Sequence, residues 1–441
     1  MLNYGNGPST GQVQTNARRV FTEFTAQDLE MSDADKQILR KLAEKVANLA
    51  VRPEMAEKRE LWRKLNRLEK IRPAVLCWPE NGWNEIITEA QMMCKGKIAR
   101  YWEMDLRKEI FWGEEMGDDK PVEPYFDVPC TIGPDDWGVE IIEHESGIQD
   151  GSKVWEPPIK DYDKDLQQLK MPVIDIDWET SKSSYEIAKE TFGDILQIRQ
   201  KSVWWGSFGI TREIVKLRGL MNLYTDFYDH PEGLKSLLTF ISETNMAKLD
   251  FLEENHLLHL NNDGTYIGSG GFGFTDELPQ ADFEGRVRAV DLWGFTESQE
   301  TVNVSPEMYA EFVFPAEKPI MDRFGFTCYG CCEELHSRWH VVKNHHNLRR
   351  VSCSPWSDVK KMSEFLEDRY ILSLKPIPTP LSQPVLDKES MRSEIRKLLE
   401  TTRDNVVELN MKDHHTIGNN PENVVEWSRI AKEEAMRVAE I

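Results

Sequence analysis

The chain has 441 residues, of which 40% are hydrophobic, and its formal net charge is -22 at pH 7. This length allows either one large hydrophobic core or two to three ordinary domains. The negative charge repels the phosphate backbone of nucleic acids, which are therefore not expected as partners.

The sequence carries no signal for a membrane or for secretion. It has no run of about 18 consecutive apolar residues, and the segment 1–16 is polar, without the apolar region of a signal peptide. The seven cysteines are an odd number, which argues against a disulfide framework. We therefore expect a cytoplasmic protein without a membrane span.

Residues 1–70 are predicted to form an N-terminal helical segment. One helix is expected to begin at Ser32 or Asp33, either of which can cap it, and to end at Pro53. Its apolar side chains recur at helical spacing: Ile38, Leu39, Leu42, Val46 and Leu49. A second apolar stripe lies between residues 61 and 68.

Residues 71–441 alternate short apolar runs with helical stretches, which is the pattern of parallel strands with covering helices. The eight strand-like runs are 74–78, 195–199, 257–260, 287–293, 325–329, 350–353, 370–374 and 406–411. Helical stretches lie at 234–252, 306–320, 358–366 and 390–399. Eight such units predict an α/β protein, a (β/α)8 TIM barrel.

A long insert, at about residues 81–194, separates the first strand-like run from the second. It exceeds a normal connection between strand and helix, and it is rich in Trp, Asp, Glu and Pro. A lid, an oligomer arm and a surface for a partner protein all fit this composition.

The active site of a parallel barrel lies at the carboxyl ends of its strands, so the residues just after each run are candidates. Those predicted to bind a substrate are Trp204, Trp205, Asn262, Asp263, Tyr266, Gln299, Trp356 and Lys375. Trp204 and Trp205 fit a packing role equally well. Lys412 also follows a run, and the glycine-rich stretch 268–273 is interpreted as a tightly turning loop of the active site.

Three cysteines crowd the end of the fifth run, where Cys328 is followed by Cys331 and Cys332. Thiolate and imidazole are favoured zinc ligands, and a catalytic zinc site has three protein ligands and one open position. Cys331, Cys332 and His414 are therefore the candidate zinc ligands. The alternative is that these cysteines are buried and pack as small apolar side chains.

Four segments resemble the uroporphyrinogen decarboxylase superfamily, in particular its anaerobic branch linked with corrinoid-dependent methyl transfer. They are Tyr329-Gly-Cys-Cys-Glu333, the segment 348–358, Ser373-Leu-Lys-Pro376 and Pro421-Glu-Asn423. The resemblance covers roughly residues 70–435 and implies the same barrel.

Two departures from the superfamily narrow the activity that the resemblance implies. The decarboxylases hold the substrate's carboxylates with arginines after the first strand, whereas this chain reads Cys77-Trp-Pro-Glu-Asn-Gly-Trp83. Methyltransferases that use coenzyme M bind zinc through a His-x-Cys motif, whereas this chain has Tyr329-Gly-Cys331. The resemblance thus implies that Cys331 is a zinc ligand. Cys332, Glu333 or Glu297 is a candidate to replace the missing histidine, and Asp413 or His414 lies near the place of the third ligand.

The leading hypothesis is a methyltransferase that moves a methyl group between a small methylated substrate and the cobalt of a separate corrinoid protein. A phenyl methyl ether, a methylamine or a methylthiol is such a substrate. The leaving atom needs a zinc ion or a general acid, for which Glu297, Glu333 and Asp413 are candidates. The alternatives are a cofactor-independent decarboxylase of a small carboxylic acid or tetrapyrrole, and a scaffold without catalytic activity.

The corrinoid is expected on another polypeptide because this chain has no Asp-x-His-x-x-Gly pattern. The complex must form and separate in each cycle, so a transient and largely polar interface is expected. Its rim is predicted to include parts of the long insert. Oligomerisation stays possible.

Overall fold

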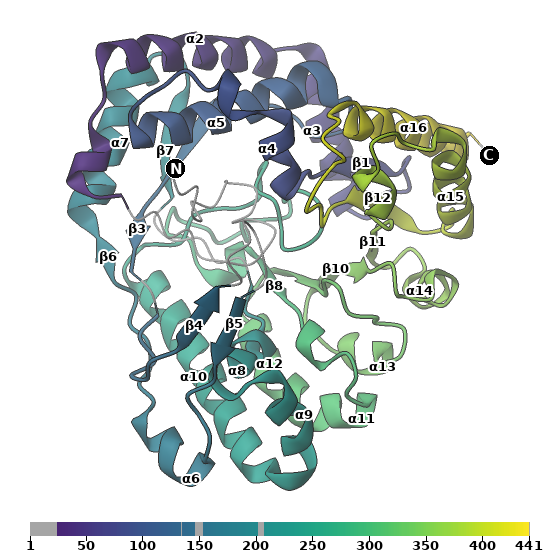
Figure 1. Ribbon diagram of the computed structural model, residues 1–441. Helices are drawn as coiled ribbons and strands as arrows, with labels where there is room; N and C mark the ends of the chain where they lie inside the picture. Colours follow the sequence, from purple (N-terminus) through teal and green to yellow (C-terminus); the bar gives the residue numbers. More distant parts are fainter. Residues whose placement is uncertain (1–23, 134, 146–152, 202–206, 441) are drawn as a thin grey trace.

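The computed structural model describes residues 24–133, 135–145, 153–201 and 207–440, and Figure 1 shows the arrangement of its helices and strands. Within these residues the largest sheet has six parallel strands, in the spatial order β1, β12, β11, β10, β9, β8. They are β1 (Ala74–Cys77), β8 (Trp293–Thr296), β9 (Phe326–Tyr329), β10 (Leu348–Cys353), β11 (Ile371–Leu374) and β12 (Val406–Met411). Every one of these strands lies in one of the predicted runs or overlaps it.

The first strand of this sheet pairs with the last, with Ala74 opposite Glu408 and Cys77 opposite Met411. From β8 onward each strand is joined to the next by a helical connection, as parallel pairing requires. The connections contain α11 (Pro306–Met308), α12 (Phe314–Met321), α13 (Trp339–Val342), α14 (Val359–Leu366) and α15 (Lys388–Thr401). The α/β class predicted from the sequence is confirmed.

Two of the eight predicted runs lie outside the six-stranded sheet, and the prediction of their pairing needs correction. The run 195–199 forms most of β7 (Gln197–Lys201), which pairs with β2 (Tyr125–Pro129). Arg199 of β7 binds Asp127 of β2 at 2.6 Å, so opposite charges favour this pairing. The run 257–260 is not a strand. The side chain of Asn261 bonds both the N–H and the C=O of Trp293, which satisfies the edge of β8 without a backbone ladder.

Two aspartates cover the free edge of β1. The Asp119 carboxylate accepts the N–H of Val75, and the Asp118 carboxylate accepts the N–H of Cys77. Asp119 also binds Arg72 through both oxygens, at 2.7 Å each, and lies 3.3 Å from the Lys432 ammonium. Although burial opposes its charge, Arg72 and Lys432 lower the pKa of Asp119. Two carboxylates therefore bond the free edge of β1, and that of Asp119 is itself paired with two cations.

The glycine-rich loop 268–273 lies against the interior of the sheet. Arg350 of β10 and Glu408 of β12 form a fully buried ion pair at 3.2 Å. A Cβ atom at Gly270 would come within 2.2 Å of the Arg350 side chain, and one at Gly271 within 2.7 Å of Glu408. The glycines are thus needed for close packing on this ion pair.

The N-terminal helices form a second hydrophobic core together with the long insert. α2 (Asp33–Ala50) begins at Ser32, whose hydroxyl accepts the N–H of Asp35 as predicted for a cap. The helix ends three residues before Pro53, which is instead the first residue of α3 (Pro53–Asn66). Side chains of α2 pack with those of α5 (Lys97–Phe111), α7 (Trp178–Phe192) and β2. Figure 1 shows α2 lying along α5 at one end of the molecule.

The remaining elements include β3 (Thr131–Ile132), β6 (Ile176–Asp177), β4 (Ile142–Glu145), β5 (Lys153–Glu156), α6 (Tyr162–Asp165), α8 (Ile210–Arg218), α9 (Leu220–Asp229), α10 (Pro231–Glu254) and α16 (Glu422–Ala439). Most of them lie in the lower half of Figure 1, whereas β3 and β6 lie at its left side and α16 lies beside β1. None of the helices in the described residues is both long and apolar enough to span a membrane.

The buried ion pair at the edge of β1 gives a prediction about stability. Asp119→Ala leaves the Arg72 guanidinium, the Lys432 ammonium and the N–H of Val75 without their partner, and we expect it to lower the free energy of unfolding by about 3 kcal/mol. Asp404→Ala is the control, because Asp404 and its partner Lys70 are exposed and such pairs contribute less than about 1 kcal/mol. Urea unfolding measures both variants, and equal losses would contradict the role of Asp119.

Candidate active site

The carboxyl ends of the parallel strands bring several predicted residues to one end of the sheet. Glu297 follows β8, Cys331 follows β9, Lys375 follows β11, and Lys412 and His414 follow β12. All of these side chains are buried. We call the region formed by residues 297–300, 331–333, 375 and 412–414 the strand-end site.

Two thiols and an ammonium group meet in the strand-end site. The Sγ atoms of Cys331 and Cys332 are 3.6 Å apart, and the Nζ atom of Lys412 lies 3.9 Å from the Sγ of Cys331 and 3.2 Å from Asp413. The hydrogen bond with Cys332 and burial raise the pKa of Cys331, whereas the same bond lowers the pKa of Cys332. Burial opposes the charge of Lys412, but Cys331, Asp413 and Glu80 raise its pKa above the usual value. Lys412 and Asp413 thus form an ion pair beside the two thiols.

The Glu333 side chain joins the end of β8 to the end of β9. Its Oε1 accepts the N–H of Ser298 at 2.9 Å, and its Oε2 accepts the N–H of Cys331 at 2.8 Å. On the other side, the Ser352 hydroxyl donates to the C=O of Cys331, and the Lys375 ammonium donates to the Ser352 hydroxyl. The backbone of Cys331 is therefore fixed at both its N–H and its C=O.

Glu297 is a buried carboxyl group among other acids. Burial, together with the charges of Glu300 and Glu333, raises its pKa well above the usual value, which favours the protonated form. A Cβ atom at Gly209 would lie 2.2 Å from Oε1 of Glu297, so the segment just before α8 packs directly on the carboxyl group. A protonated carboxylic acid that is shielded from water is suited to donate a proton to a substrate.

His414 and Trp78 offer polar atoms without partners. Both ring nitrogens of His414 and the indole Nε1 of Trp78 are buried, with no hydrogen-bond partner among the described residues. Burial lowers the pKa of His414 to about 4, so the ring is neutral at pH 7. Buried polar groups are nearly always satisfied, so these atoms fit hydrogen bonding to a substrate or to water.

The three predicted zinc ligands do not form a closed ligand set. Among the residues that the structure describes, no group of three or more His, Cys, Asp or Glu side chains is placed to hold a metal ion. The ammonium of Lys412 lies on the Cys331 thiol, where a cation would have to bind. Zinc at Cys331, Cys332 and His414 therefore stays a prediction, and no chemical step is derived from it here.

Other predicted substrate residues have different surroundings. Tyr266 is buried near Lys412, and Asn410 donates to its hydroxyl at 2.8 Å. Asp263 binds Arg199 at 2.6 Å, next to β7, and the side chain of Asn262 donates to the C=O of Leu278. Trp356 is 72% exposed. Gln299 is partly buried beside Glu300, while Trp204 and Trp205 lie outside the described residues.

Backbone strain marks three of the strand ends. Glu80 after β1 and Asp413 after β12 have φ of 51° and 67°, and Gly330 after β9 has 95°. Left-handed backbone is unfavourable for residues other than glycine and clusters at functional sites. The position of Asp413 after the last strand was enough to identify it as a candidate site residue from the sequence. Its left-handed backbone could not be predicted from the sequence.

A network that the sequence did not indicate supports Ser298. The Tyr329 hydroxyl lies 2.9 Å from the Ser298 hydroxyl and 2.7 Å from that of Tyr309, and both tyrosines donate to Glu317. Arg338, which is buried, donates to Ser298 at 3.1 Å. The network holds the residue whose N–H orients Glu333. Its members come from helices as well as strands, so no local motif identifies them.

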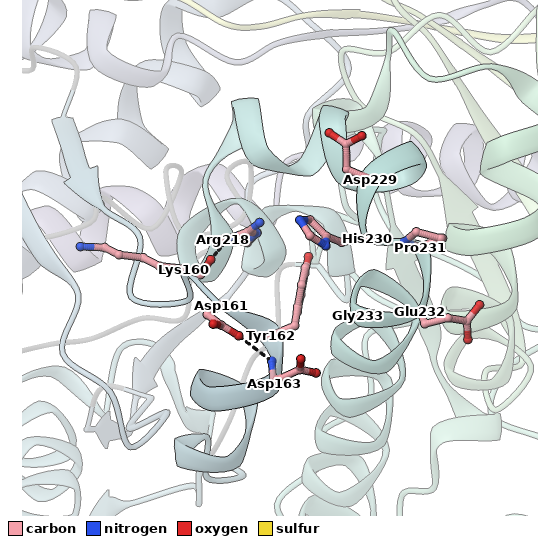
Figure 2. A pocket seen from close by; sticks show the side chains of 10 residues that line it. All are labelled: Lys160, Asp161, Tyr162, Asp163, Arg218, Asp229, His230, Pro231, Glu232 and Gly233. Atoms are coloured by element: carbon pink, nitrogen blue, oxygen red, sulfur yellow. Dashed lines mark hydrogen bonds between the residues drawn. The ribbon is translucent and has the colours of Figure 1, made fainter.

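A pocket of about 520 Å³ lies away from the strand-end site. Figure 2 shows its lining: Lys160, Asp161, Tyr162, Asp163, Arg218, Asp229, His230, Pro231, Glu232 and Gly233. Arg218 binds Asp226 through two nitrogens and donates to the C=O of Lys160, and the Tyr162 hydroxyl donates to Asp226. These bonds anchor α6 and the segment before it to the end of α8 and to α9. The predicted site residues have no part in this pocket.

The comparisons with known proteins give only distant structural likenesses. No protein-family profile matches the chain, and no curated protein matches it. A solved structure, a methyltransferase from Methanosarcina mazei, aligns with a TM-score of 0.48 and 13% identity over 85% of this chain and 98% of its own. At this identity the alignment transfers no residue role to this chain.

The network beneath Ser298 gives a prediction about pH. Burial raises the pKa of Glu317 to about 8 from its ordinary value of 4.5. The folded protein then binds more protons at this group than the unfolded chain, so its contribution to stability is complete below pH 4.5 and declines up to about pH 8. We expect the free energy of unfolding of the wild type to fall over this window relative to Glu317→Gln, by at most about 1.4 kcal/mol per pH unit. Urea unfolding at several pH values measures this, and parallel curves would contradict it.

Proposed function

We propose that this protein is a methyltransferase that moves a methyl group between a small methylated substrate and the cobalt of a separate corrinoid protein. The observation that carries the proposal is the buried carboxyl group of Glu297 in the strand-end site, whose pKa is raised by burial and by the charges of Glu300 and Glu333. Methyl transfer from oxygen or nitrogen requires such an acid, because the leaving atom keeps the bonding electron pair and needs a proton.

The step is a displacement at the methyl carbon. The reduced cobalt supplies an electron pair to the methyl carbon while the bond from carbon to oxygen or nitrogen breaks. Glu297 gives its proton to the leaving atom, which becomes an alcohol or an amine. Burial keeps the proton on the acid while the substrate is neutral. When negative charge develops on the leaving atom beside it, that atom attracts the proton and the transfer becomes favourable.

The surrounding side chains supply orientation. The indole N–H of Trp78 and the two ring nitrogens of His414 are buried without a hydrogen-bond partner among the described residues. They can therefore form hydrogen bonds with the methylated substrate. The Lys412 ammonium is positioned by Asp413 at 3.2 Å and places a positive charge in the site. A positive charge stabilises an oxygen that gains electron density as its bond to the methyl group breaks.

The corrinoid would arrive on another protein. The cobalt has to reach a methyl group held at the ends of the strands, so we propose that the partner docks over the strand-end site and over parts of the long insert. Such an interface is transient and polar. The proposed partner, an O-demethylase role and a place in anaerobic metabolism follow from the resemblance to the corrinoid-linked branch.

The experiment is a methyl-transfer assay with the purified protein, a reduced corrinoid protein and candidate methyl ethers, amines and thiols. The change in absorbance from cob(I)alamin to methylcobalamin follows the reaction. We expect Glu297→Gln to lower the rate by about 10²- to 10⁴-fold, because an amide has no acidic proton to give. The wild-type rate should also fall as the pH rises through the raised pKa of Glu297.

Glu307→Gln is the matched control, because Glu307 is exposed in α11 and is not part of the strand-end site. It should keep the wild-type rate. Transfer that is unchanged in Glu297→Gln would contradict the general-acid step, and methyl transfer without any corrinoid protein would contradict the proposed acceptor.

Zinc is a separate prediction of the resemblance. We expect about one zinc ion per chain, lost in Cys331→Ser, because a thiolate binds zinc far more strongly than a hydroxyl does. Elemental analysis of both purified proteins measures this. A wild type that contains no zinc and still transfers methyl groups to the corrinoid protein would contradict the prediction and leave Glu297 as the proton donor to the leaving atom.

A decarboxylase is the second candidate, and the two buried lysines favour it. Lys375 and Lys412 are both fully buried in the strand-end site and suit a substrate carboxylate. Release of carbon dioxide from a small carboxylic acid, without any corrinoid protein, would replace the methyltransferase proposal by this one.

A further inference from the structure

The neighbouring cysteines of the strand-end site differ from the other cysteines of the chain. All seven lie in the described residues, and six of them are buried, whereas Cys332 is exposed. The Sγ atoms of Cys331 and Cys332 are 3.6 Å apart, in contact but not bonded. An oxidant in solution therefore reaches one thiol directly, and the second thiol already lies beside it.

The backbone around this pair favours a reaction between its two sulfurs over a reaction with another cysteine. Glu333 accepts the N–H of Cys331 and Ser352 donates to its C=O, so this residue is held in place. Cys332 directly follows it, which keeps its sulfur near that of Cys331 whenever the exposed side chain rotates. The effective concentration of one thiol at the other is consequently high.

We propose that Cys331 and Cys332 form a redox-sensitive dithiol, which peroxide oxidises to a disulfide between adjacent residues. The Cys332 sulfur attacks one peroxide oxygen, the O–O bond breaks, and water leaves, which produces a sulfenic acid. The Cys331 sulfur then attacks the Cys332 sulfur, and the S–O bond breaks with release of a second water. Two thiols and one hydrogen peroxide thus give one disulfide and two waters.

This disulfide is reversible for a geometric reason. Adjacent Cα atoms are about 3.8 Å apart across a trans peptide, whereas ordinary disulfides join Cα atoms at about 4.4 to 6.8 Å. The ring that adjacent cysteines close is therefore strained, and strained exposed disulfides are the readily reduced ones. Oxidation removes both thiols from the strand-end site, and a dithiol reductant restores them.

The test counts thiols and maps the bond. The protein is treated with hydrogen peroxide in buffer that contains a metal chelator, denatured, and titrated for free thiols. We expect the wild type to lose two of its seven thiols and to regain them with dithiothreitol. In the tryptic peptide 324–338, which holds Cys328, Cys331 and Cys332, mass spectrometry should show the loss of two hydrogen atoms.

Three variants separate this pair from other reactions. Cys328→Ser is the matched control, because Cys328 lies in the same peptide but is buried in β9, and it should still lose two thiols. Cys331→Ser and Cys332→Ser should lose none to a reducible disulfide. Cys332 is exposed, so its replacement by serine is not expected to disturb folding.

Phenylarsine oxide gives an independent measurement, because trivalent arsenic binds two neighbouring thiols at once. We expect one arsenical per wild-type chain, displaced by dithiothreitol, and none on the peroxide-treated protein or on either serine variant of the pair. Wild-type protein that keeps seven thiols after peroxide, or that gains only oxygen atoms on Cys332, would overturn the proposal. Neither measurement uses a methyl donor or a corrinoid, so the outcome is independent of the proposed function.

Discussion

The pairing of β1 with β12 is the constraint on which the strand-end site depends. It joins the beginning of the α/β region to its end, with Cys77 opposite Met411. Since the strands are parallel, the residues that follow them come to the same end of the sheet. Glu80 and Trp78 thereby lie on the side of the site where Lys412 and His414 lie. The opposite edge of β1 has no strand partner, and the carboxylates of Asp118 and Asp119 take over the bonds that a strand would make.

Burial determines the chemistry of the site once the strands have placed it. Glu297 and Lys412 are both shielded from water, and burial by itself favours the neutral form of each. Acidic neighbours and burial together raise the pKa of Glu297, whereas for Lys412 its neighbours outweigh burial and favour the charged form. The strand-end site can therefore offer both a proton and a positive charge.

The hydrogen bonds of Glu333 and of the network beneath Ser298 fix the backbone next to the cysteine pair. Glu333 holds the N–H of Cys331 and the N–H of Ser298, so the ends of β8 and β9 move together. Beneath Ser298, buried hydroxyl groups lead through Tyr329 to Glu317. A buried polar network of this kind is costly when it is incomplete, so it fixes the geometry of the strand ends strongly.

Local patterns in the sequence were sufficient for the α/β class and for the six strands of the parallel sheet. These strands are buried on both faces of the sheet, so each is a short, nearly continuous apolar run that is followed by polar residues. This pattern can be recognised without knowledge of the strand partners. The same reasoning located Glu297, Cys331, Cys332 and Lys375 at strand ends. It also predicted strands at 195–199 and 257–260 as members of one barrel.

Only the tertiary structure decided the partners of these residues. β7 pairs with β2 through the charges of Arg199 and Asp127, and Asn261 replaces a strand with its side-chain amide. No repeating pattern in the sequence indicates either contact, because each contact joins residues that are distant along the chain. The contact between Lys412 and Cys331 and the proton held by Glu297 likewise depend on distance and burial. Sequence spacing thus determined which side chains end the strands, and packing determined which of them meet.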